Sequence, residues 1–130
     1  MSQSEIKLNK VAVLMLGVKD LAKSVAFYRD TLGLQPQGEV PGEFAFFQAG
    51  DMMLALSVPH ADAKISPSVV GGMEVVFAVE DVGTAYEALK ARGVQFVREP
   101  RVATGTSWSA VFTDPNGHRL SIFGPNKSGS

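Results

Sequence analysis

The feature that most constrains this chain is a pattern that occurs twice, the second copy about 60 positions after the first. Val18-Lys19-Asp20-Leu21 follows one apolar run, and Val79-Glu80-Asp81-Val82 follows another. In both copies a helical spacing of apolar residues begins at once, and an aspartate at this position can cap a helix by accepting from an early backbone N–H. The chain is therefore interpreted as one unit written twice, and a repeat of this length is too long for a solenoid.

The first copy predicts one strand, one helix and three further strands. Apolar residues recur at helical spacing from Leu21 to Leu32, and Gly33 provides a suitable C-terminal stop. Glycine and proline turns separate the apolar segments that follow. The expected elements are a strand at 11–18, a helix from 21 to 32, and strands at 34–39, 44–48 and 52–58.

The second copy predicts the same order of elements. Gly93 stops its helix, Glu99-Pro100 is expected to end a short strand, and Asp114-Pro115-Asn116-Gly117 is a strong turn sequence. Residues 103–106 are interpreted as a plain loop. The expected elements are a strand at 73–79, a helix from 82 to 92, and strands at 94–97, 107–113 and 119–123.

These elements predict an α+β fold of two βαβββ modules in tandem, whose mixed sheets form a cup with the helices on the outer face. We expect a single domain over residues 1–130, with module one at about 10–58 and module two at about 72–124. A linker at about 59–71, rich in proline and glycine, contains His60.

Composition excludes several classes of function. The net charge is −1, so the chain has neither a nucleic-acid footprint nor a polybasic membrane patch. Its apolar runs are far shorter than a membrane span, and the polar N-terminus lacks a secretory signal pattern. The absence of cysteine excludes disulfides, thiolate metal sites and a cysteine nucleophile. We therefore expect a cytoplasmic location.

Several motifs resemble one known family. Val18-Lys19-Asp20-Leu21, together with Phe27-Tyr28 and Leu32-Gly33, resembles the first signature of the vicinal oxygen chelate superfamily. That superfamily includes glyoxalase I, the extradiol dioxygenases, and the fosfomycin and bleomycin resistance proteins. The segments at 77–82 and 114–118 resemble its second-half signatures, so the resemblance covers about residues 11–124.

The resemblance implies where a metal would bind in an active relative. Metal enzymes of the superfamily place four His, Gln or Glu ligands on the inner strands, and these positions correspond here to Val13, Ala55, Glu74 and Ser121. Valine and alanine have no ligating side chain, and neutral serine is a poor ligand. Because a catalytic divalent ion normally has about three protein ligands, we expect neither a metal nor another cofactor. His60 and His118 lie away from these positions and are interpreted as solvated loop histidines.

Strand alternation predicts which side chains face the cup. The cup set is mixed in character and includes Ser57, whereas the opposite set, for example Leu54 and Leu120, is uniformly apolar and belongs against the helices. Among the phenylalanines, Phe44 and Phe46 share one face and Phe47 takes the other, and one of these faces should contribute to the cup. The predicted ligand-binding residues are Val13, Met15, Met53, Ala55, Glu74, Val76, Trp108, Arg119, Ser121 and Phe123.

For three of these residues, the sequence leaves two possible roles open. Glu74 can face a ligand, with a pKa raised by desolvation that would suit a general base, or it can pair with Arg119. Arg119 can grip a ligand carboxylate or neutralise Glu74. Trp108 can stack on a flat ligand or belong to the core.

The function that we expect first is a metal-free small-molecule-binding protein resembling the bleomycin-resistance type, which sequesters an apolar or aromatic ligand in the cup. The resemblance also implies a homodimer with crevices between modules of different subunits. The alternative is a glyoxalase-like lyase or isomerase, or a dioxygenase-related enzyme, possibly metal-independent with Glu74 as the base. A structural or regulatory module without a ligand is a third possibility, because fold alone does not decide function.

Overall fold

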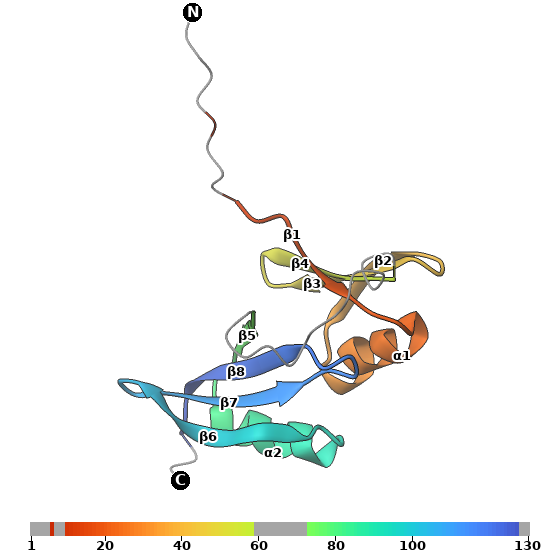
Figure 1. Ribbon diagram of the computed structural model, residues 1–130. Coiled ribbons are helices and arrows are strands. Elements are labelled where there is room, and N and C mark those ends of the chain that lie inside the picture. The colour runs from red at the N-terminus through yellow and green to blue at the C-terminus, as the bar shows by residue number, and fades with distance from the viewer. Residues whose placement is uncertain (1–5, 7–9, 59–72, 128–130) are drawn as a thin grey trace, which may run out of the picture.

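The computed structural model describes residues 6, 10–58 and 73–127 and contains two similar modules (Figure 1). The predicted linker and His60 lie outside the described residues. Each module has a four-stranded sheet and a helix, and the order of elements is the predicted βαβββ in both. The α+β fold of two tandem modules is therefore confirmed.

The first module contains a helix that continues as a π-helical turn, here called η1. Its sheet has the order β1-β4-β3-β2, in which β1 and β4 are parallel and the other pairs antiparallel. The elements are β1 (Val13–Gly17), α1 (Leu21–Ala26), η1 (Phe27–Thr31), β2 (Gln35–Val40), β3 (Phe44–Ala49) and β4 (Met52–Ser57).

The second module repeats this topology. Its sheet has the order β5-β8-β7-β6, again with a single parallel pair, β5 and β8. In Figure 1, β5 lies on the side of this sheet nearest the first module. The elements are β5 (Val75–Ala78), α2 (Val82–Ala91), β6 (Phe96–Thr104), β7 (Ser107–Thr113) and β8 (Arg119–Pro125).

The predicted aspartate cap forms a side-chain hydrogen bond at α1 but not at α2. Asp20 is the N-cap of α1 and accepts from the Lys23 backbone N–H at 3.0 Å. Asp81 occupies the same position before α2, but its carboxylate accepts instead from the Lys127 backbone N–H at 2.7 Å. Gly93 follows α2 with φ of +92°, a left-handed conformation in which glycine carries no Cβ penalty.

The strand predicted at 94–97 is longer in the structure. β6 runs through Pro100 to Thr104 and pairs with β7, so the prediction that Glu99-Pro100 ends the strand is wrong. Of the predicted loop at 103–106, residues 103 and 104 belong to β6, and residues 105 and 106 form the turn before β7. Proline is tolerated here because β6 is an edge strand and its register shifts between Arg98 and Arg101.

Each sheet has two faces. We call the face on the side of the module's own helix the helix face, and the opposite one the open face. The helix faces carry the predicted apolar set: Leu16, Leu54, Leu56, Leu120 and Ile122 are buried in the core. Leu14, Val75 and Phe77 are partly buried against the same core. The burial of these residues confirms that the predicted apolar set belongs against the helices.

The turn at 114–118 joins the second module to the first through hydrogen bonds. Asp114 is 5% exposed and accepts from the Tyr28 hydroxyl at 2.7 Å. Asn116 accepts from the Lys19 backbone N–H at 3.2 Å and donates to the Ser24 hydroxyl at 3.0 Å. We call this group of contacts the junction turn.

His118 belongs to the junction turn. Its Nε2 lies 2.7 Å from the Gly17 carbonyl oxygen, which can only accept, so Nε2 carries the proton. The ring is part-buried between the modules. The interpretation of His118 as a solvated loop histidine is therefore wrong.

Among the described residues, neither helix has the length or the apolar character that a membrane span requires.

Replacing Tyr28 with phenylalanine tests the junction turn. The substitution removes one donor from a buried carboxylate, so we expect the free energy of unfolding in urea to fall by about 2 kcal/mol. Tyr86→Phe is the matched control, because Tyr86 packs its ring on Phe96 and has no described hydroxyl partner. Equal stability of the Tyr28 variant and the wild type would contradict the role assigned to this contact.

Candidate ligand-binding site

The open face of the first sheet carries an apolar group of side chains. Strand register places Met15 beside Ala55 and Ala55 beside Phe46, so these residues share one face. Phe44 and Phe46 stack at 6.1 Å between ring centroids with 20° between their planes. Phe47 instead lies in the core against Tyr28. The predicted residues Val13, Met15, Met53 and Ala55 are thus brought together, and the Phe44–Phe46 pair joins them.

The open face of the second sheet carries a polar centre. Glu74 directly precedes β5, and its carboxylate accepts from Arg119 Nε at 2.8 Å. Ser121, which is 1% exposed, also hydrogen-bonds to this carboxylate. Val76 lies beside Ser121 in the register. The structure therefore brings Glu74, Val76, Arg119 and Ser121 together, with Phe123 further along β8 on the same face.

The pKa of Glu74 differs from the expectation of a raised value. Partial burial alone would raise this pKa, but hydrogen bonds from Ser121 and Arg119 outweigh that effect, helped by the positive charges of Arg119 and Arg98. The net result is a pKa below the usual range of a glutamate. Of the two readings of Glu74, the structure agrees with the ion pair with Arg119 and not with a pKa raised by desolvation.

Two arginines on this face were missed from the sequence. Arg98 donates to the Ser109 hydroxyl at 2.6 Å and to the Ser109 carbonyl at 3.1 Å. Arg101 lies opposite Ser109 in the register, so both arginines are on the open face although three positions separate them. The register shift in β6 makes this possible, since regular alternation would put them on opposite faces.

Burial and charge act together on Arg98. Partial burial lowers the pKa of Arg98, and the neighbouring charges of Arg101 and Arg119 act in the same direction, against the opposing effect of Glu74. Arg98 thus lies close enough to both Arg101 and Arg119 to be influenced by each, and the Glu74 carboxylate lies near Arg119 and Arg98.

Trp108 does not join this group. It is paired with Val102 and Gly124 in the register. Its side chain is on the same side of β7 as those of Ala110 and Phe112, which are buried on the helix face. It packs against the hydrophobic core. Of the two readings of Trp108, the structure agrees with the one that places it in the core layer.

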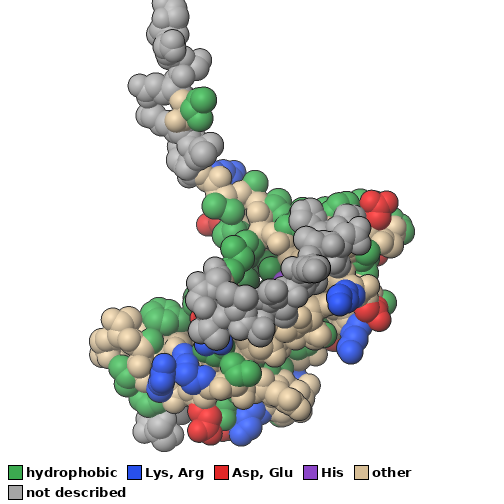
Figure 2. All heavy atoms as spheres, viewed as in Figure 1, with side chains coloured by type: hydrophobic (Ala, Val, Ile, Leu, Met, Phe, Trp, Pro, Cys, Tyr) green, Lys and Arg blue, Asp and Glu red, His purple; other side chains and the backbone are tan. Residues whose placement is uncertain are grey.

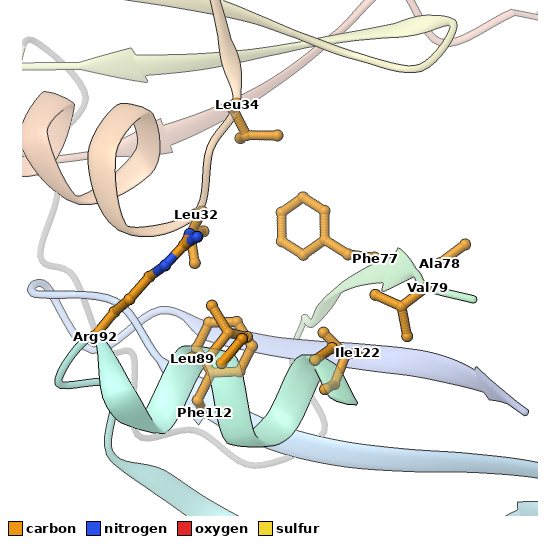
Figure 3. A pocket seen from close by; sticks show the side chains of 11 residues that line it. Leu32, Leu34, Phe77, Ala78, Val79, Leu89, Arg92, Phe112 and Ile122 are labelled. Atoms are coloured by element: carbon orange, nitrogen blue, oxygen red, sulfur yellow. The ribbon is translucent and has the colours of Figure 1, made fainter. Parts of the chain in front are cut away.

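An apolar cavity of about 330 Å³ lies between the modules, on the helix side (Figure 3). Phe77 projects into it from β5, with Leu34 above and Leu89 below in this view. Among the described residues that line it, Arg92 is the one with a charge, and it donates to the Thr31 carbonyl at 2.9 Å. Because this cavity offers few polar groups that converge on a ligand, we regard the open faces as the stronger candidate site.

The four positions that would hold a metal do not fit a divalent ion. Val13 and Ala55 present only carbon atoms, and the carboxylate of Glu74 is already engaged by Arg119 and Ser121. Across the part of the chain that the structure describes, no group of three or more His, Cys, Asp or Glu side chains could hold a metal ion. No other arrangement of donors there compensates for the two missing ligands.

The lowered pKa of Glu74 predicts how stability depends on pH. A carboxylate whose pKa is lower in the folded state stabilises the fold above its unfolded pKa and loses that contribution as the pH falls through the folded pKa. We therefore expect wild type to exceed Glu74→Gln in free energy of unfolding at about pH 7, and the difference to shrink below about pH 4. Chemical denaturation at several pH values measures this, with Glu87→Gln on the exposed side of α2 as control. A difference that grows on acidification would refute the assignment.

Comparison with known proteins gives a consistent result. The family model of the Glyoxalase/Bleomycin resistance protein/Dioxygenase superfamily matches residues 8–122. The glutathione transferase FosA of Serratia marcescens is 31% identical over 111 residues, covering 84% of this chain and 76% of that protein. A probable lactoylglutathione lyase of Synechocystis is 26% identical over 117 residues, covering 83% of this chain and 89% of that protein.

Solved structures show the same fold. TnmS3, an antibiotic-binding protein from Streptomyces, superposes with a TM-score of 0.72 at 22% identity, covering 94% of this chain and all of that one (100%). At this identity the likeness shows the fold alone. Together with the family model, which spans most of the residues, the βαβββ repeat and the motifs on it show that this chain belongs to the Glyoxalase/Bleomycin resistance protein/Dioxygenase superfamily.

Proposed function

We propose that this chain is a small-molecule-binding protein that takes an apolar or aromatic ligand on its open faces without a resident divalent metal. The observation that carries the proposal is the donor set at the four ligand positions of the superfamily. Three of the four side chains cannot serve as good ligands, and the fourth, Glu74, is held in an ion pair with Arg119.

The apolar side chains of the open faces support a binding role. Val13 and Met15 are 39% and 37% exposed, and Val76 is 54% exposed, although all three lie on strands. The stacked pair of Phe44 and Phe46 adds a flat aromatic surface beside them. A flexible methionine next to aromatic rings, with a few polar groups nearby, is a typical lining for an organic ligand.

An enzymatic function is the alternative, since the similar proteins include a glutathione transferase and a probable lyase. A metal-independent reaction would use Glu74 as its base. The ion pair with Arg119 and the lowered pKa of Glu74 both weaken that role, because an efficient base has a pKa near the working pH. We therefore favour binding over catalysis.

A neutral aromatic dye tests the proposed function. We expect N-phenyl-1-naphthylamine to bind chelator-treated protein, with an increase in fluorescence, and its affinity to stay unchanged when Zn²⁺, Ni²⁺, Mn²⁺ or Fe²⁺ is added. The melting temperature should likewise be the same in chelator and in metal. Stoichiometric retention of a metal ion after removal of the excess, or the absence of dye binding, would overturn the proposal.

We also propose that two chains associate through their open faces, so that a sheet of one subunit covers a sheet of the other. The exposed apolar side chains of these faces support this, because an uncovered strand face with valine and methionine favours contact with a partner surface. Such an arrangement would place the apolar face of the first sheet near the polar centre of the second sheet from another subunit.

A charged substitution on the open face tests the association. Val76→Lys introduces a cation on the open face of β5, and we expect the molar mass measured by light scattering to fall from two chains to one. Val102→Lys is the matched control, because Val102 is similarly exposed, at 56% against 54% for Val76, but its side chain lies on the helix face of the edge strand β6. A monomeric wild type, or an unchanged mass for the Val76 variant, would contradict this association.

A further inference from the structure

Among the described residues, the open face of the second sheet carries more positive than negative side chains. Within residues 10–58 and 73–127, Arg98, Arg101 and Arg119 share this face with a single carboxylate, that of Glu74. Figure 2 shows Lys and Arg side chains gathered over the same module. Glu99 is close in sequence, but it lines a cavity beside α2 together with Thr84 and Tyr86, so it lies on the other side of the sheet.

The three guanidinium groups differ in how much of their hydrogen-bonding capacity is used. Arg98 is fixed by Ser109. Arg119 uses Nε for Glu74, and within the described residues no contact is shown for its two terminal nitrogens. Arg101 likewise has no described hydrogen bond or ion pair. The fixed guanidinium of Arg98 thus lies between those of Arg101 and Arg119, which have N–H donors available. Guanidinium donors match the oxygens of a carboxylate, sulfonate or phosphate.

Holding like charges together in a partly buried place is costly unless an opposite charge arrives. This cost applies to Arg98, because burial and the charges of Arg101 and Arg119 all disfavour its charged form. Glu74 offsets only part of it. An anionic group bound among these side chains would remove the repulsion and complete the hydrogen bonds of Arg101 and Arg119.

We propose that Arg98, Arg101 and Arg119 form a subsite for an anionic group, so that the ligand of this protein is an apolar or aromatic organic anion. This inference rests on the proposed binding function and adds the class of ligand. The apolar part of such a molecule suits Phe44, Phe46 and Met15, and its anionic group suits the arginines. In this arrangement Ser121 and Glu74 orient Arg119 and do not contact the anion.

A pair of dyes that differ in charge separates this inference from the binding function itself. N-phenyl-1-naphthylamine is neutral, and 1-anilinonaphthalene-8-sulfonate has the same aromatic rings with a sulfonate added. We expect Arg101→Gln and Arg119→Gln each to lower the affinity for the sulfonate dye about tenfold relative to the affinity of the same variant for the neutral dye, which is the effect of losing one charge-assisted hydrogen bond. Raising the salt concentration should weaken the sulfonate dye alone.

Arg92→Gln is the matched control, since it removes the same charge at the rim of the cavity between the modules. Arg101→Gln keeps the test independent of folding, because Arg101 has no described partner to lose, whereas Arg119→Gln leaves Glu74 unpaired. If the neutral dye binds but the sulfonate dye is insensitive to both variants, or responds to Arg92→Gln instead, the anion subsite is wrong and the binding function stands. If neither dye binds, the binding function fails and this inference fails with it.

Discussion

The hydrogen bond between the Tyr28 hydroxyl and Asp114 is the contact on which the arrangement of the two modules depends. Asp114 is buried, and a buried carboxylate is costly without donors. It receives three: the Tyr28 hydroxyl, and the backbone N–H groups of Asn116 and His118. Burial and the nearby negative charge of Asp114 raise the pKa of Tyr28, so the hydroxyl keeps its proton and remains a donor. The junction turn leads directly into β8, and it therefore sets where Arg119 and Ser121 lie relative to the first module.

The two sheets have the same topology but different open faces. The first presents carbon-rich side chains, with Phe44 and Phe46 stacked on it, and the second presents the ion pair of Glu74 and Arg119 with two further arginines. The two modules repeat one topology, but the side chains on their open faces differ, so that one face is apolar and the other cationic. The proposed ligand, with an apolar body and a charged end, has one part suited to each of these two kinds of face.

Much of the fold could be predicted from the sequence, because its signals are local. The aspartate caps, the glycine stops and the alternation of apolar residues act over a few positions, and they gave the order of elements and the two faces of each sheet. β6 was predicted too short because Pro100 is a strand breaker in general, and only the edge position and the register shift allow it. Arg98 and Arg101 were missed for the same reason, since a bulge changes which face a residue takes and leaves no local signal. His118 was misjudged because its partner, the Gly17 carbonyl, is about a hundred positions away in the chain.

The charge on the second open face explains how a lone carboxylate can persist there. In metal enzymes that this chain resembles, a divalent cation balances the ligand carboxylate. Here Val13 and Ala55 cannot hold such an ion, yet Glu74 remains at its position, and an unpaired carboxylate there would be destabilising. Arg119 supplies the counter-charge at 2.8 Å, and Arg98 adds to it from the neighbouring strands. Among the described residues, the guanidinium groups outnumber the carboxylate, so arginine side chains give this face an excess of positive charge. The proposed subsite for an anionic group rests on this excess of positive charge.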